Sequence, residues 1–274
     1  MSILRDVMVA DVRWVAGSAL VRHAAALMAD HEIGSVLVED KNGTPVGIVT
    51  ETDLVRRIIA EDRHPWATRV DQVMNPSIVT LEETRLLNEA VTLMATRNIR
   101  HLGVTKDGDI VGVVVARDVL TKEAMPVAPV RKIMSRLVAT IPMHGTVREA
   151  ATRMTEATVG SVLVTGRRVR MRPGQRRIGR DSDIAGIVTE GDLVRKLVAT
   201  DRYPYVTPVA DLMETHLQTI DAEEPVRAAG VLMAHEGIRH LIVTEGPEEI
   251  VGLLSMRDIL RSTSESTSVK TEPS

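Results

Sequence analysis

The sequence has no cysteine, no phenylalanine, and only two tryptophans and two tyrosines among its 274 residues. Without cysteine the chain cannot form disulfides, thiolate nucleophiles or Cys-ligated metal centres. The scarcity of aromatic side chains argues against recognition of single-stranded nucleic acid by base stacking. We therefore expect a core built from Val, Ile, Leu, Met and Ala.

A strong charge of one sign and a long apolar run are also lacking. The formal net charge is -3, which gives no global attraction to nucleic acid or to a membrane. No apolar stretch reaches 18 residues, and the first residues do not resemble a signal peptide. We expect a cytoplasmic protein with no membrane association.

What the sequence does contain is an internal repeat, present in four copies. A strand-like run from Gly to Asp reads GIVTETD at 47–53, GVVVARD at 112–118, GIVTEGD at 186–192 and GLLSMRD at 252–258. A hydrophobic pair ending in Met opens each copy, as Val7-Met8, Val73-Met74, Ile133-Met134 and Leu212-Met213. Between them lies IGSVLV at 33–38, IRHLGV at 99–104, VGSVLV at 159–164 and IRHLIV at 238–243. Copies one and three share Gly-Ser and copies two and four share Arg-His, so we take the consecutive pair as the natural domain.

Each copy shows the same order of expected elements. A short apolar segment precedes a helix with apolar residues at 3–4 spacing, for example Leu20, Ala24, Leu27 and Met28. Two β-branched strands follow, separated in the first copy by a turn at Asn42-Gly43, and a second helix begins at the Asp. This βαββα order predicts an α+β fold of small mixed sheets covered by helices, with copies pairing through an exposed sheet face.

These landmarks resemble the cystathionine-β-synthase (CBS) domain family, arranged as two tandem pairs called Bateman modules. The arrangement is similar to the γ subunit of AMP-activated protein kinase and to stand-alone prokaryotic proteins with four CBS repeats. The predicted repeats cover residues 3–62, 68–124, 127–200 and 207–262, and the polar residues 263–274 are predicted to be a disordered tail.

The resemblance implies binding of AMP, ADP, ATP or S-adenosylmethionine in clefts between the two repeats of a pair. Within each motif the Asp would take the ribose hydroxyls, the Thr or Ser would lie near ribose and phosphate, and the Arg-His strands would reach phosphates. The predicted polar site residues are Thr50, Asp53, Arg100, His101, Arg117, Asp118, Thr189, Asp192, Arg239, His240, Ser255 and Asp258.

The resemblance also implies apolar walls for the adenine, at Val12, Ile33, Ile78, Ile99, Val138, Val159, Leu217 and Ile238. Each predicted site combines the Asp of one repeat with two wall residues of its partner repeat. The four sites are Asp53 with Ile78 and Ile99, Asp192 with Leu217 and Ile238, Asp258 with Val138 and Val159, and Asp118 with Val12 and Ile33. Asp53 and Asp192 are the favoured sites, followed by Asp258. The Asp118 site is weakened because Val115 replaces the Thr or Ser, and because the bulky Trp14 stands where the other repeats carry Thr.

Structural explanations compete with these roles. An Asp at a helix start caps free backbone N–H groups, and the Thr residues suit a strand. The Arg and His residues would serve equally in interface salt bridges, and the walls would be apolar in any core. Three of the four aromatic residues, Trp66, Tyr203 and Tyr205, occupy the equivalent linkers DRHPWATRV and DRYPYVTPV.

The third repeat carries an insertion, residues 167–180, with seven Arg in 14 residues around a Pro-Gly turn. We expect an extended hairpin or mobile loop, either simply solvated or docking an acidic partner, polyphosphate or nucleic acid.

Catalytic signatures are absent from the sequence: it contains no P-loop, GxGxxG after a strand, HExxH or GxSxG. The sequence therefore predicts a non-catalytic sensor of adenine nucleotides, without catalytic cofactor or metal. It would act on a protein partner as a disc-like monomer or a homodimer. The alternatives are an S-adenosylmethionine sensor, a nucleic-acid-associated regulator that uses the insertion, and a structural oligomerising module with empty clefts.

Overall fold

The computed structural model describes residues 2–120, 125–166, 177–178, 182–200, 202–246 and 249–268. Within this part the predicted βαββα order is confirmed in all four repeats. The residue six positions after each opening Met begins the first strand, as Trp14, Thr80, Thr140 or Thr219.

The elements of the first half have the following bounds. Repeat 1 contains β1 (Trp14–Ala16), α1 (Val21–Asp30), β2 (Ser35–Glu39), β3 (Pro45–Thr50) and α2 (Glu51–Leu54), which continues as the π-helical η2 (Val55–Ala60). Repeat 2 contains β4 (Thr80–Glu82), α3 (Leu87–Arg97), β5 (His101–Lys106), β6 (Asp109–Val115) and α4 (Ala116–Leu120). One 3-10 turn precedes each repeat, η1 (Leu4–Asp6) and η3 (Val70–Gln72).

The second half repeats this arrangement. Repeat 3 contains β7 (Thr140–Pro142), α5 (Val147–Ala157), β8 (Ser161–Thr165), β9 (Arg177–Ile178), β10 (Ser182–Thr189), α6 (Glu190–Lys196) and η5 (Val198–Thr200). Repeat 4 contains β11 (Thr219–Asp221), α7 (Val226–His235), β12 (His240–Glu245), β13 (Glu249–Ser255) and α8 (Met256–Ser268). The preceding 3-10 turns are η4 (Val130–Lys132) and η6 (Val209–Asp211).

The sheet of each repeat is mixed, as the sequence predicted. In repeat 1, β1 runs parallel to β2, and β2 runs antiparallel to β3; the equivalent strands of the other repeats pair in the same way. The hairpin turns use residues that tolerate a positive φ. Gly43 has φ 78°, and the Asp107-Gly108 turn between β5 and β6 has φ values of 54° and 94°.

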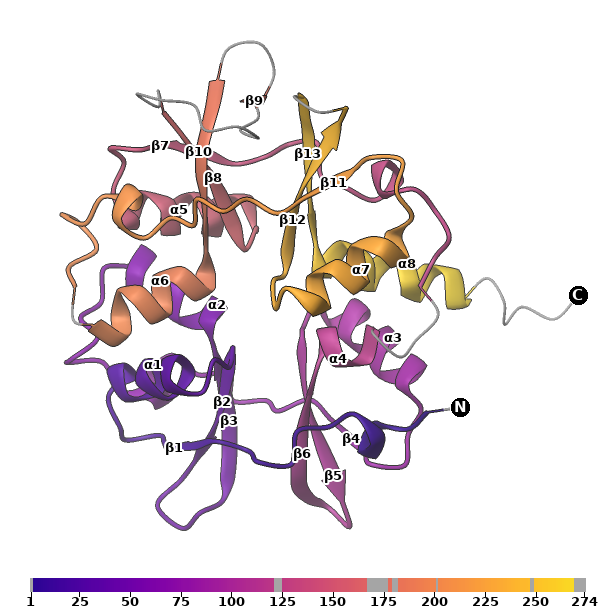
Figure 1. Ribbon diagram of the computed structural model, residues 1–274. Coiled ribbons are helices and arrows are strands. Elements are labelled where there is room, and N and C mark those ends of the chain that lie inside the picture. The colour runs from indigo at the N-terminus through magenta and orange to yellow at the C-terminus, as the bar shows by residue number, and fades with distance from the viewer. Residues whose placement is uncertain are drawn as a thin grey trace, which may run out of the picture. The chain divides into compact units, whose positions relative to one another are not determined.

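The chain divides into two compact units, and each unit takes one repeat from each half. We call residues 13–78 and 138–217 the odd unit, because they hold the bodies of repeats 1 and 3. Residues 1–12, 79–137 and 218–274 form the even unit, with the bodies of repeats 2 and 4. Within each unit the helices of the two repeats pack together between the two sheets (Figure 1).

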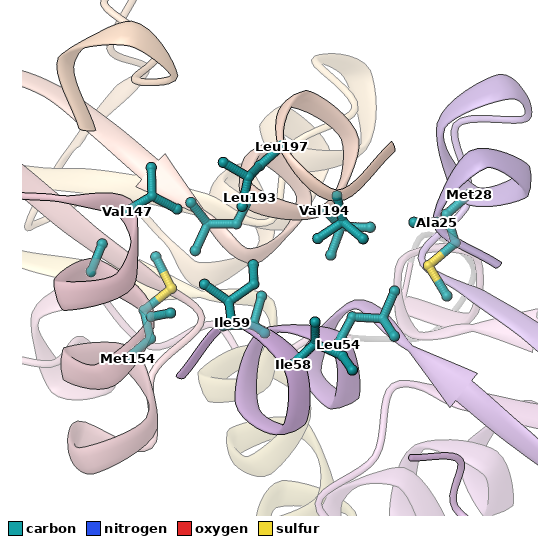
Figure 2. Packing of buried hydrophobic residues seen from close by; sticks show 14 of the residues in the cluster. Ala25, Met28, Leu54, Ile58, Ile59, Val147, Met154, Leu193, Val194 and Leu197 are labelled. Atoms are coloured by element: carbon teal, nitrogen blue, oxygen red, sulfur yellow. The ribbon is translucent and has the colours of Figure 1, made fainter. Parts of the chain in front are cut away.

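This grouping differs from the prediction that the natural domain is the consecutive pair. Its physical cause is the apolar helix faces, which bury one another across alternate repeats. In the odd unit Leu54 and Ile58 of repeat 1 are close to Leu193, Val194 and other core residues of repeat 3 (Figure 2). Full burial of one such side chain contributes about 1.5–3 kcal/mol, so the packing of helices from repeats 1 and 3 contributes substantially to the stability of the unit.

Both cores are aliphatic, as the composition predicted. The buried clusters of the two units consist of Val, Leu, Ile, Met and Ala among the described residues. Aromatic side chains play no part in either cluster.

Consecutive repeats are nevertheless tied together by an exchange of their opening segments. The crossover segments, residues 7–9, 73–75, 133–135 and 212–214, each lie on the third strand of the other repeat in their consecutive pair. Asn75 N donates to Ile48 O at 2.8 Å, and Ile48 N donates to Asn75 O at 2.9 Å. The same two-bond bridge joins Val9 to Val113, Ser135 to Leu253 and Glu214 to Ile187.

The exchange explains why the strand motif always begins with Gly. A Cβ at Gly47 would lie 2.6 Å from Asn75 O and 2.8 Å from Met74 Sδ. Gly186 is equally crowded, because its Cβ would lie 2.7 Å from Glu214 O and 2.8 Å from Met213 Sδ. Only a glycine admits the crossover backbone at this distance. The Met and Gly landmarks are thus the two sides of one contact.

The predicted disordered tail is wrong for residues 263–268, which continue helix α8. Thr263 and Ser264 are 3% and 8% exposed, and Thr263 Oγ1 donates to Ile259 O at 2.8 Å. The prediction relied on polar composition, but the hydroxyl groups of Ser and Thr can donate hydrogen bonds to backbone carbonyls of the preceding helical turn, so a polar segment can still be helical. Residues 269–274 lie outside the described residues.

No helix in the described part of the chain combines the length and apolar character required to cross a membrane.

The Gly47 and Gly186 contacts predict a large cost for a single methyl group. Gly47→Ala and Gly186→Ala should each lower the free energy of unfolding by about 1–3 kcal/mol, because the opposing backbone carbonyl cannot move aside cheaply. Chemical denaturation would measure this. Gly17→Ala is the matched control in the same unit, since its Cβ would meet its nearest neighbour at 3.4 Å, an ordinary contact. Equal stability of Gly47→Ala and Gly17→Ala would contradict the close-approach explanation.

Candidate functional site

The Thr-x-x-Asp motif forms a reciprocal capping box at a strand-to-helix junction. Thr50 is the N-cap of α2 and Asp53 is its third helical residue, so the helix begins before the Asp and not at it. Thr50 Oγ1 and Thr50 N donate to Asp53 Oδ2 at 2.6 and 3.0 Å, and Asp53 N donates to Thr50 Oγ1 at 3.3 Å. Thr189 and Asp192 repeat this geometry in α6.

The same box exists at Ser255 and Asp258 but not at the second repeat. Ser255 Oγ donates to Asp258 Oδ2 at 2.6 Å. Val115 has no hydroxyl, and Asp118 instead has an ion pair with Arg117, 3.4 Å from Oδ1 to Nε. The departure seen in the sequence therefore changes the local structure, and capping by itself accounts for the recurring Thr or Ser.

The boxes occupy only one oxygen of each carboxylate, and the second oxygen differs between repeats. Asp192 Oδ1 lies 2.8 Å from Lys196 Nζ, and Asp53 Oδ1 lies 3.8 Å from Arg57 Nη2. Asp258 has no ion pair among the described residues, and Ser255 contacts only its Oδ2. Its Oδ1 can therefore accept a further hydrogen bond without displacing a cation, whereas Asp53 Oδ1 and Asp192 Oδ1 each have a cation nearby.

Arg57 and Lys196 also hold the crossover segments. Arg57 Nη1 donates to Val73 O at 2.7 Å and to Met74 O at 2.9 Å. Lys196 Nζ donates to Leu212 O at 2.9 Å. One cation in each repeat of the odd unit thus connects the candidate Asp to the crossover.

The odd unit contains a buried polar network that the sequence reasoning missed. Glu51 and Glu190 are 1% and 3% exposed, and both lie directly after the N-cap Thr. Arg195 Nη1 donates to Glu51 Oε1 at 2.9 Å, and Thr52 Oγ1 donates to Glu190 Oε2 at 2.9 Å. Gly191, the counterpart of Thr52, makes room for the Arg195 guanidinium, because a Cβ there would lie 2.5 Å from Arg195 Nη2.

A signal for this network was present in the sequence. Repeats 1 and 3 have Glu after the Thr, whereas repeats 2 and 4 have Ala116 and Met256 followed by Arg. The network affects the adjacent candidate site, because burial, with a smaller contribution from the charge of Glu190, raises the pKa of Asp53 above its usual value.

The even unit contains both Arg-His strands. His101 begins β5 directly across from Val115, and His240 begins β12 directly across from Ser255, three residues before Asp258. Burial of the imidazole lowers the pKa of His101 to about 3, helped by the nearby charges of Arg100 and Arg239. Arg239 comes from repeat 4, so basic groups from repeats 2 and 4 share one electrostatic environment.

The predicted adenine walls are neither core nor fully exposed. Every one of the eight is half-buried, as are the twelve predicted polar residues. The predicted groups divide between the units: for Asp53 of the odd unit, Ile78 belongs to the odd unit and Ile99 to the even unit. These groups stay predictions.

The equivalent linkers of the two halves meet in the odd unit. The Trp66 ring lies 4.6 Å from that of His64 and 5.8 Å from that of Tyr203, between ring centroids. The Arg148 guanidinium lies over Tyr205, 5.1 Å from the ring centroid. Trp14 is half-buried at the start of β1.

The Arg-rich insertion lies outside the described residues except for Arg177 and Ile178. These two form β9, which pairs antiparallel with Ser182 and Asp183 of β10. Across the described residues, no group of three His, Asp or Glu side chains is arranged to hold a metal ion.

Comparison with known proteins gives the family. The model of the CBS domain matches residues 4–60, 70–124, 130–199 and 209–265. Protein MK0525 of Methanopyrus kandleri is 34% identical over 110 residues, 40% of this chain and 56% of the relative. CBSCBSPB2 of Arabidopsis thaliana is 25% identical over 260 residues, 86% of this chain and 48% of the relative. The chain thus spans about half the length of these curated relatives.

A solved structure extends the likeness to the fold of the whole chain. Protein MJ1225 of Methanocaldococcus jannaschii superposes with a TM-score of 0.73 at 16% identity, covering 95% of this chain and 99% of that one. Four matched domains account for most of the sequence, and the resemblance inferred from its motifs is confirmed. The chain belongs to the CBS domain family.

Proposed function

We propose that the protein is a non-catalytic regulator that binds adenine nucleotides, AMP, ADP or ATP, on its CBS repeats. The observation that carries this proposal is that one compact unit, the even unit, contains the Arg-His strands of both repeat 2 and repeat 4. Arg100 and Arg239 both act on His101, and His240 lies across from Ser255, beside the capping box of Asp258.

The electrostatics of this basic cluster favour an anion. Desolvation of the His101 imidazole, helped by the charges of Arg100 and Arg239, lowers its pKa to about 3, so the ring is neutral at pH 7. A phosphate would oppose both charges, and a guanidinium fork matches phosphate oxygens in geometry. The cluster favours a nucleotide over S-adenosylmethionine, whose sulfonium is positive and which has no phosphate.

The carboxylates supply the complementary half of a nucleotide site. Asp258 keeps Oδ1 available while Ser255 holds Oδ2, which orients the carboxylate for a ribose hydroxyl. Asp53 and Asp192 have the same orientation, with a cation nearby. Rigid, pre-oriented acceptors reduce the entropy lost on binding.

Regulation would follow from differential binding to two arrangements of the repeats, read by a protein partner. MJ1225, the solved structure of similar fold, is described as a candidate archaeal homolog of g-AMPK, which agrees with a regulatory role. The nucleic-acid alternative rests on residues 167–180, of which only Arg177 and Ile178 are among the described residues.

Nucleotide binding should stabilise the fold. AMP, ADP or ATP at a hundredfold excess over its dissociation constant should add about 2.7 kcal/mol for one site, measured as a rise in melting temperature. S-adenosylmethionine serves as the comparison ligand. No shift with any of the three nucleotides would leave the structural module with empty clefts as the better explanation, and a shift with S-adenosylmethionine alone would favour that sensor.

The same assay tests the residues. Arg100→Ala with Arg239→Ala should abolish most of the shift, whereas Arg227→Ala, an exposed Arg on α7 of the same unit, should leave it unchanged. Asp258→Asn keeps an acceptor for the cap but removes the charge, and should weaken binding at least about tenfold, since one charged hydrogen bond is worth roughly 1.5–3 kcal/mol. Asp118→Asn is the matched control. Equal effects of the two Asn variants would refute the ribose assignment.

The lowered pKa of His101 makes stability depend on pH in a defined window. Above pH 6.5, its ordinary pKa, the imidazole is neutral in both the folded and the unfolded chain and contributes no pH dependence. Between pH 6.5 and about 3 the unfolded chain binds a proton that the folded chain does not. The free energy of unfolding therefore falls on acidification, by at most about 1.4 kcal/mol per pH unit from this group.

Replacement of His101 should remove that slope. Denaturation of His101→Gln between pH 4 and 6.5 should show a flatter decline in stability than the parent protein. His216→Gln, an exposed histidine, should keep the parental slope. A parental slope in His101→Gln would show that another group titrates in this window.

A further inference from the structure

We propose that the crossover methionines are reversible oxidation sites through which a peroxide-class oxidant weakens the candidate ligand sites. Each crossover segment carries one of them, Met8, Met74, Met134 or Met213. The residue before them varies between Val, Ile and Leu, but the Met is the same in all four segments. With no cysteine in the sequence, no thiol competes for the oxidant.

The thioether of each crossover Met packs against a glycine so closely that no additional heavy atom fits between them. A Cβ at the opposing glycine would lie 2.7 Å from Met8 Sδ, 2.8 Å from Met74 Sδ, 2.9 Å from Met134 Sδ and 2.8 Å from Met213 Sδ. An oxygen added to sulfur is about as demanding as a methyl group and is polar as well. A sulfoxide at these positions would therefore push the crossover away from the strand.

Exposure separates the crossover methionines from a second set. Each repeat also carries one Met inside its first helix, namely Met28, Met94, Met154 and Met233, and these are 0–1% exposed. The four crossover methionines are only half-buried. Because susceptibility of a thioether follows its access to oxidant, these two sets of four, among the 13 methionines of the sequence, provide matched reactive and protected positions.

The chemistry needs one oxidant, a hydroperoxide. The sulfur lone pair attacks the terminal peroxide oxygen, the O–O bond breaks, and an S–O bond forms. Sulfur loses two electrons, and the peroxide is reduced to an alcohol or water, its proton moving to the departing oxygen. Methionine sulfoxide reductases reverse the change, one enzyme for each epimer.

In the odd unit a direct relay leads from the crossover to the candidate Asp. Met74 O accepts from Arg57, whose other terminal nitrogen lies 3.8 Å from Asp53 Oδ1. Lys196 connects Leu212 O, the residue before Met213, with Asp192 Oδ1. Displacement of either crossover segment would remove the carbonyl that positions Arg57 or Lys196. The ion pair of that cation with Oδ1 of Asp53 or Asp192 would then change.

The strand gives a second connection. Gly47 and Thr50 belong to the same strand β3, three residues apart, and Ile48 between them is bridged to Asn75. Loss of this bridge would loosen the strand end that forms the capping box with Asp53. The inferred effect on ligand affinity rests on the proposed nucleotide function, but the oxidation and its effect on stability do not.

The experiment maps oxidation on the full-length protein. After brief hydrogen peroxide treatment and quenching, peptide mass spectrometry should find sulfoxide at the crossover methionines at least about tenfold sooner than at the helix methionines, since exposure governs the rate. The melting temperature should fall in proportion and recover with methionine sulfoxide reductases A and B. Equal oxidation rates in the two sets, or oxidation with an unchanged melting temperature, would overturn the proposal.

Matched variants separate the two sets. Substitution of Leu at Met8, Met74, Met134 and Met213 conserves volume and should give a protein whose melting temperature resists peroxide. Substitution of Leu at Met28, Met94, Met154 and Met233 should leave it sensitive. If the first variant fails to fold, a single Met74→Leu should protect the bridge to Ile48, measured by hydrogen exchange of the Ile48 amide. Failure of this protection would also count against the proposal.

A separate measurement concerns the ligand. Nucleotide-induced melting shifts should shrink after oxidation of the parent protein and not after oxidation of the crossover Leu variant. If no nucleotide binds the untreated protein, the proposed function fails while the mapping and melting results still decide the oxidation proposal.

Discussion

The approach of one chain segment onto the backbone of another repeat is the constraint on which this structure depends. At Gly47 the crossover carbonyl oxygen of Asn75 lies only 2.6 Å from the place where any other residue would carry its Cβ. Two backbone hydrogen bonds then fix the register of segment and strand. Because the helices meanwhile pack across alternate repeats, every repeat is attached to two others by different means, by backbone exchange within a consecutive pair and by aliphatic packing within a unit.

The two units differ in the charge at the junction between their repeats. At the junction of repeats 1 and 3 the carboxylate of Glu51 is almost inaccessible and is balanced by Arg195. At the equivalent place in the even unit, Ala116 and Met256 are apolar, and the charge there is instead the positive charge of the Arg-His strands. Removal of one partner of a buried ion pair leaves an uncompensated buried charge and is strongly destabilising. The odd unit is therefore suited to hold the two halves of the chain together. The even unit contains the cationic groups on which the proposed nucleotide site depends.

Much of the fold was predictable from the sequence, because the same pattern appears four times and each copy corrects errors in the others. The strands, helices, mixed sheets and aliphatic cores followed from local pattern. The grouping of repeat 1 with repeat 3 could not be predicted from the sequence. The amphipathic pattern of a helix shows that one face is buried but does not show which helix packs against that face. The Thr-x-x-Asp motif was recognised, yet its role as a capping box emerged only from the atoms. The sequence contained both landmarks of the segment exchange, the Met and the Gly. Only the structure, through the contact between Met74 and Gly47, shows that the two landmarks face each other.

The assembly of each unit from alternate repeats has a consequence for how the chain is made. During synthesis the first half emerges with helices α1 and α2 and helices α3 and α4 complete, but each pair lacks the helices that cover it. Those helices belong to repeats 3 and 4, more than a hundred residues later. The odd core can close only after repeat 3 has left the ribosome, and the even core only after repeat 4 has followed, so both units reach their stable form late in synthesis. A break in the middle of the chain would leave two halves, each with two uncovered aliphatic faces.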